Sequence, residues 1–89
     1  MIKHLSIRAQ GRVQGVFYRL AAKDQALSLG LSGLARNEPD GGVLIEAEGE
    51  ETALARFAEW CAHGPEQSTV RKLEIQEGPV TGLKGFLVR

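Results

Sequence analysis

The chain has 89 residues, of which 43% are hydrophobic and 25% are charged. These values are typical of one globular domain over residues 1–89 and exclude a disordered or membrane-spanning protein. Eleven basic residues balance eleven acidic ones, so no overall field attracts nucleic acid or an anionic membrane. The single cysteine excludes an internal disulfide, and the N-terminus lacks a signal-like apolar run, so we expect a cytoplasmic protein.

The first half of the sequence predicts a strand, a helix and a hairpin. Apolar and polar residues alternate over residues 3–10, which is the period of a strand with one buried face. Residues 18–30 lack proline and β-branched residues and end in glycine, which favours a helix, although its apolar stripe is weak. Residues 32–38 and 43–49 then predict two strands joined by a tight Pro-Asp-Gly-Gly turn.

The second half predicts a helix and two strands. Residues 50–63 show the clearest helical period of the sequence, and Cys61 lies on the apolar stripe. We therefore expect Cys61 to be a buried structural residue. Residues 70–77 and 85–89 complete the pattern as a strand and a short C-terminal strand.

This order of elements favours a ferredoxin-like α+β fold. A strand, a crossover helix and a parallel strand form a right-handed unit, and the strand that returns by the hairpin fits between them. The result is an antiparallel sheet of order 4-1-3-2, plus the short C-terminal strand, with both helices on one face. The ends of the first and second strands then lie at the same edge of the sheet, roughly 10 Å apart.

The loop of residues 11–19, GRVQGVFYR, enters the first helix and is rich in glycine. Such a loop directs several backbone N–H groups at one spot and can cradle an anion. The guanidinium of Arg19 adds a planar charged fork that matches phosphate oxygens, and we expect it to face Asn37 across one small pocket. We expect three apolar side chains to keep the loop packed and partly dry. These are Val13, Val16 and Phe17.

Taken alone, these features also have simpler explanations. Glycine-rich loops before helices are commonly only turns, and Asn37, just before Glu38-Pro39-Asp40, suits a turn residue.

Two signatures in this chain resemble those of acylphosphatases, small enzymes that hydrolyse the mixed anhydride of a carboxylic and a phosphoric acid. The first signature runs glycine-x-valine-glutamine-glycine-valine-x-aromatic-arginine. It is matched by Gly11, Val13, Gln14, Gly15, Val16, Tyr18 and Arg19. The second signature begins glycine-aromatic-small-basic-asparagine and continues with spaced glycine and valine positions. It is matched by Gly33, Ala35, Arg36, Asn37, Gly41, Val43 and Gly49.

The resemblance implies a ferredoxin-like fold and a hydrolase that needs no metal or cofactor. It implies an acyl phosphate as substrate, with phosphate or sulfate as further anions of the site. Arg19 would bind the phosphate and Asn37 would orient the attacking water. The phosphate-binding loop would consist of Gln14, Gly15, Val16, Phe17, Tyr18 and Arg19. Leu34 departs from the second signature, where an aromatic is usual, and we expect it to alter the packing behind Asn37.

The chemistry of acyl phosphates is consistent with so small a set of groups. The leaving carboxylate belongs to an acid with a pKa of about 4, so it departs without a proton donor. Charge develops on the phosphoryl oxygens, where an N–H nest and an arginine stabilise it. Hydrolysis of a phosphate monoester must expel an alkoxide, which is a poor leaving group, so we expect little activity on such esters.

Other functions are weaker interpretations. Cys61 and His63 point to different faces of their helix, so they do not form a nucleophile pair. His4 and His63 have no metal-binding spacing with Glu46 and Glu48, and we expect both glutamates to line a solvated strand face rather than to act as acid and base. Few aromatics and zero net charge disfavour a ferredoxin-like RNA-binding or regulatory module. The sequence does not distinguish an active enzyme from a catalytically silent relative that only binds an anion. We expect the protein to be a monomer.

Overall fold

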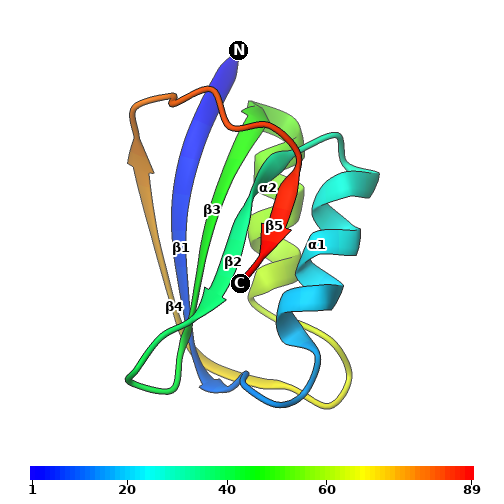
Figure 1. The fold of residues 1–89 in the computed structure, drawn as a ribbon, viewed down its shortest axis with the longest axis vertical. Helices are drawn as coiled ribbons and strands as arrows, with labels where there is room; N and C mark the ends of the chain where they lie inside the picture. The colour runs from blue at the N-terminus through cyan, green and yellow to red at the C-terminus, as the bar shows by residue number, and fades with distance from the viewer.

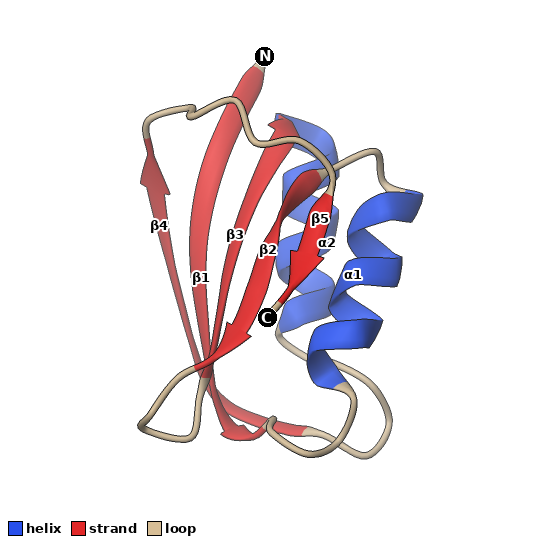
Figure 2. Ribbon diagram, in the orientation of Figure 1, coloured by secondary structure: helices blue, strands red, loops and turns tan.

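The computed structural model describes all 89 residues and shows a five-stranded sheet with two helices on one face (Figures 1 and 2). The strands are β1 (Ile2–Arg12), β2 (Ser32–Asn37), β3 (Val43–Glu50), β4 (Thr69–Gly78) and β5 (Phe86–Val88), and the helices are α1 (Tyr18–Ser28) and α2 (Glu51–Cys61). The sheet order is β4-β1-β3-β2-β5. The predicted elements, the ferredoxin-like arrangement and the order of the first four strands are confirmed.

The predicted antiparallel pairing of the first four strands is confirmed, and the short C-terminal strand adds one parallel pair at the edge of the sheet. β1 and β2 both pair antiparallel with β3, and β4 pairs antiparallel with β1, but β5 pairs parallel with β2. The connection after β4 explains this direction. The last residues of β4 and the first residues of β2 lie at the same end of the sheet. Residues 79–85 cross the sheet at that end (Figure 1), so β5 starts there and runs in the same direction as β2.

The core lies between the sheet and the helices. α2 buries Leu54, Phe57 and Cys61, as its period predicts. α1 buries mainly small residues on its sheet side and leaves Leu20 and Leu27 exposed. The prediction that this helix has only a weak apolar face is therefore confirmed. Neither helix has the length and apolar character needed to cross a bilayer.

The opposite face of the sheet is crossed by residues 79–85, which we call the strap. Beneath it, Glu48 is only 4% exposed, so the prediction that this glutamate lies on a solvated face is wrong. Its carboxylate accepts hydrogen bonds from the N–H groups of Thr81, Gly82 and Leu83 and from the Thr81 hydroxyl. No other hydrogen bond joins residues 79–84 to the rest of the chain.

His4 completes this arrangement from β1. Its Nδ1 lies 2.7 Å from Oε2 of Glu48, and its Nε2 lies 2.5 Å from Oε1 of Glu46. Burial lowers the pKa of His4, but the two glutamates outweigh this effect and raise it above its ordinary value. A doubly protonated imidazole can donate to both carboxylates, which a neutral ring cannot do.

Candidate active site

The loop between β1 and α1 (residues 13–17) contains two residues in the left-handed region. Gly15 has φ 74°, and Phe17, which caps α1, has φ 62°. Such a path curls the backbone into a concave nest of N–H groups. The N–H groups of Gly15, Val16 and Phe17 donate to no acceptor within the chain, and the first turn of α1 adds further N–H groups without an intrahelical partner.

The side chains of this loop divide between core and solvent. Val13 and Val16 are buried, as predicted, and anchor the loop. The prediction that Phe17 packs with them is wrong, because this side chain is 72% exposed. Its position at the left-handed cap of α1 turns it away from the core that its neighbours enter.

A hollow of about 350 Å³ opens beside the loop. It is lined by Val13, Gly15, Phe17, Tyr18, Arg19 and Leu20. A Cβ placed on Gly15 would meet no atom within 4 Å, so the space above this residue is open. An anion held by the loop amides would lie in this open space.

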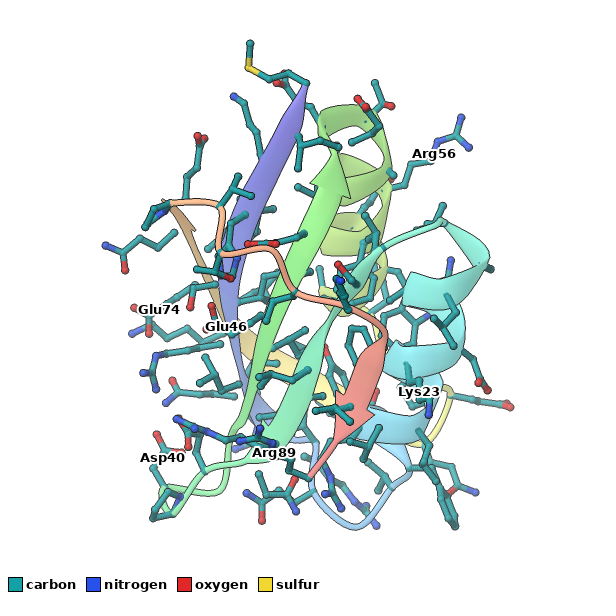
Figure 3. All side chains as sticks on the ribbon, turned by 45° about the horizontal axis from the view of Figure 1, so that its top comes forward. Lys23, Asp40, Glu46, Arg56, Glu74 and Arg89 are labelled. Atoms are coloured by element: carbon teal, nitrogen blue, oxygen red, sulfur yellow. The ribbon has the colours of Figure 1, made fainter.

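Arg19 is half-buried in the first turn of α1. Its Nη1 donates a hydrogen bond to the main-chain oxygen of Arg89, just beyond β5. Figure 3 shows Arg89 at the lower end of the molecule, the end where Asp40 of the β2–β3 hairpin also lies. The guanidinium is therefore fixed where the loop, α1 and β5 meet.

Asn37 is the last residue of β2. Both Asn37 and Ala9 of β1 lie opposite Val43 in the sheet register, so the predicted shared edge is confirmed, two strands or roughly 10 Å apart. The Asn37 side chain is exposed and makes no hydrogen bond within the chain. It does not line the hollow beside Arg19.

Gln14 ties the loop to the hairpin that carries Asn37. Its Nε2 donates to the main-chain oxygens of Glu38 and Gly42, each at 2.8 Å. With both amide hydrogens engaged, the side chain is not free to bind a phosphate, and only its backbone is available. This side-chain role is additional to the predicted place of Gln14 in the backbone of the phosphate-binding loop, and the only sequence signal for it is a lone glutamine between valines.

Tyr18 also has a structural side chain. It is only 1% exposed, its hydroxyl donates to the main-chain oxygen of Cys61 at 2.6 Å, and its ring lies 5.6 Å from that of Trp60. Burial raises the pKa of Tyr18 above its ordinary value. The aromatic position of the signature thus docks α1 on α2 and offers the site only its backbone.

The structure gives little support to a cysteine nucleophile or a metal site. Cys61 is fully buried, and burial raises the pKa of its thiol to about 12. Such a thiol is protonated at neutral pH and is a poor nucleophile. No group of three or more His, Cys, Asp or Glu side chains is arranged so that it could hold a metal ion.

Comparisons with known proteins identify one family over almost the whole chain. The family model described as Acylphosphatase matches residues 5–88. The chain is 51% identical over 79 residues to an acylphosphatase of Thermus thermophilus, which covers 89% of this chain and 90% of that protein. The solved acylphosphatase of Bacillus subtilis has a TM-score of 0.94 at 34% identity and covers 100% of this chain and 99% of its own. The acylphosphatase structure from Coxiella burnetii has a TM-score of 0.95 at 32% identity, with 99% and 93% coverage.

Proposed function

Because the chain belongs to the acylphosphatase family and hydrolyses acyl phosphates, we propose that Arg19 and the backbone of residues 14–19 hold the phosphoryl group while Asn37 orients the attacking water. One observation carries this assignment. The unpaired N–H groups from Gly15 to Phe17 lie beside a half-buried guanidinium and an open hollow. Unpaired donors and a fixed positive charge are what a phosphoryl group needs.

The binding step depends on preorganisation. Arg19 is already oriented by its hydrogen bond to Arg89, and the loop is anchored by buried valines and by the Gln14 brace. Donors that need no rearrangement stabilise charge as it develops on the phosphoryl oxygens. These groups therefore act most strongly in the transition state.

Asn37 contributes position rather than basicity. A carboxamide is not a base at neutral pH, but its oxygen accepts a hydrogen bond from water. Its free side chain lies at the sheet edge that also carries the loop. It holds the water in line with the leaving oxygen, and the water proton passes to the substrate phosphate.

The bond that breaks needs no acid from the protein. The carboxylate leaves as a stable anion, so the site needs no general acid, and we propose that the Arg19 guanidinium and the loop amides stabilise the phosphoryl charge without a metal or cofactor. The same reasoning disfavours phosphate monoesters, whose alkoxide leaves poorly. We propose a monomeric single domain that also binds phosphate or sulfate in the same cradle.

The test measures hydrolysis of benzoyl phosphate in excess chelator, with inorganic phosphate as a competitive inhibitor. Asn37→Ala should lower kcat by about 100-fold, because a misplaced reacting group typically costs about that much, and leave the inhibition constant of phosphate nearly unchanged. Arg19→Ala should weaken phosphate inhibition and also lower kcat. Arg56→Ala is the matched control, since Arg56 lies on α2 at the far end of the molecule (Figure 3).

Each assignment has its own contrary result. A normal kcat for folded Asn37→Ala would remove the role of the asparagine. Unaltered phosphate inhibition in Arg19→Ala would remove that of the arginine. A folded wild-type protein that binds phosphate without turnover would leave an anion-binding relative.

A further inference from the structure

Phe17 is an unusual residue to find exposed beside a binding site. Its side chain is 72% exposed, and Leu20, one turn further along α1, is 52% exposed. Both line the same hollow as Arg19. The molecule thus presents two large apolar side chains to solvent at the point where the phosphoryl group is proposed to bind.

The backbone of Phe17 is unfavourable as well. It adopts φ 62° and ψ 22° at the N-cap of α1 and makes no side-chain cap hydrogen bond. Residues with a Cβ rarely adopt this conformation, and N-caps usually carry Ser, Thr, Asp or Asn. Glycine or asparagine at position 17 would relieve the strain and remove the exposed ring. A strained residue beside a binding site therefore suggests a role in binding.

We propose that Phe17 and Leu20 form an apolar wall that contacts the acyl group of the substrate, so that the enzyme favours acyl phosphates with an aromatic or branched aliphatic acyl group over those with a small or charged one. This inference rests on the proposed role of Arg19 and the loop amides. The acyl carbon is joined to phosphorus through a single oxygen. A phosphoryl group held by the amides of residues 15–17 therefore places the acyl chain within reach of the hollow that Gly15 and Phe17 line.

The lining of the hollow supports an apolar acyl group. Besides Arg19 it contains no charged side chain, and four of its six residues are hydrophobic. Arg19 is occupied by Arg89 and by the proposed phosphate contact, so a charged acyl group would find no partner here. An aromatic ring would cover the exposed faces of Phe17 and Leu20 and remove apolar surface from water.

The contact is one-sided, because the hollow is open to solvent on its other side. We therefore expect it to contribute less than full burial of an aromatic ring. Removal of the wall should lower the selectivity for benzoyl over acetyl phosphate about fivefold, which corresponds to about 1 kcal/mol.

The experiment compares kcat/KM for benzoyl phosphate and acetyl phosphate in four variants. Phe17→Asn and Phe17→Gly remove the ring and suit the left-handed backbone, and Leu20→Ala shortens the second wall residue. Leu27→Ala is the matched control, because Leu27 is 50% exposed on the same helix but does not line the hollow. A change in the phosphate cradle that alters kcat/KM for both substrates by the same factor leaves the ratio of the two kcat/KM values unchanged.

The expected result is a lower benzoyl-to-acetyl ratio in the Phe17 and Leu20 variants and an unchanged ratio in Leu27→Ala. A constant ratio in the Phe17 and Leu20 variants would overturn the proposal. Equal losses on both substrates, together with weaker phosphate inhibition, would also overturn it and assign Phe17 to the cradle. Failure of the phosphate assignment shows separately, as unaltered phosphate inhibition in Arg19→Ala.

Discussion

Neutralising Glu48 should loosen the strap without touching the active site. In Glu48→Gln, one carboxylate oxygen becomes an NH₂ group that faces N–H donors from residues 81–83 instead of accepting from them. His4 loses its buried counter-ion in the same step. Because residues 79–84 have no other hydrogen bond to the chain, the strap has no alternative anchor of this kind.

The pKa of Glu48 gives the size of the effect. Burial alone would raise this pKa, but the Thr81 N–H, the His4 ring and the Leu83 N–H lower it to about 2 from an ordinary value of 4.5. At about 1.4 kcal/mol for each tenfold change in proton affinity, the free energy of unfolding should fall by about 3 kcal/mol at neutral pH. Breaking one partner of a buried pair has a similar cost, and Tm should fall by roughly 10–20 °C.

The pH dependence follows from the two directions of pKa change. The folded-state pKa of Glu48 is lowered, so its contribution is present above about pH 4.5 and is lost as the pH falls toward 2. The pKa of His4 is raised, so its contribution is present below pH 6.5 and is lost as the pH rises through the raised value. Glu46 and Glu77 are the other titratable groups in the hollow beside His4.

Denaturant unfolding as a function of pH, with hydrogen exchange of the Thr81, Gly82 and Leu83 amides, measures these effects. Glu74→Gln is the matched control, because this exposed carboxylate pairs only with exposed Lys72. His4→Asn should flatten the alkaline limb of the profile. The reasoning fails if Glu48→Gln and Glu74→Gln unfold with equal free energies and their strap amides exchange equally slowly.

Two further variants distinguish the role of Gln14, which ties the loop to the hairpin, from that of Tyr18, which packs α1 against α2. Gln14→Ala removes both hydrogen bonds between the loop and the hairpin, so it should lower stability by about 1–3 kcal/mol and also reduce kcat. A normal kcat in steady-state assays would show that the brace does not position the site. Tyr18→Phe removes only the bond to the Cys61 carbonyl, so unfolding should cost about 1 kcal/mol less while kcat is unchanged, and a large loss of kcat would contradict this.

The sequence predicts most of the fold because its strongest patterns are local. Alternation over β1 and β3, the clean period of α2 and the Pro-Asp-Gly-Gly turn each determine one element, and the right-handed crossover rule orders the strands. The sequence analysis assigned no direction to β5, because a strand of three residues has no pattern that specifies one. The burial of Glu48 was missed because its partners, the strap amides, are more than 30 residues away and carry no side-chain pattern.

Within the site, the sequence predicts what the backbone does better than what side chains do. The left-handed path at Gly15 and the shared edge of Asn37 follow from glycine placement and topology. The side-chain tasks of Gln14 and Tyr18 depend on the tertiary partners Glu38, Gly42 and Cys61, which no local pattern specifies. The sequence therefore places Gln14 in the loop but does not predict that its side chain braces the hairpin.

The first signature and the structure together separate the parts of this site. Each position that the signature fixes has a structural role. The two valines are buried, both glycines have a positive φ, and the glutamine ties the loop to the hairpin. The aromatic residue packs α1 against α2, and the arginine donates a hydrogen bond to Arg89. The unspecified position before the aromatic is occupied by Phe17, whose side chain points into solvent beside the hollow. A residue there changes what the acyl group meets without changing the cradle side chains. Selectivity among acyl phosphates can therefore vary at position 17 while the phosphoryl chemistry stays the same.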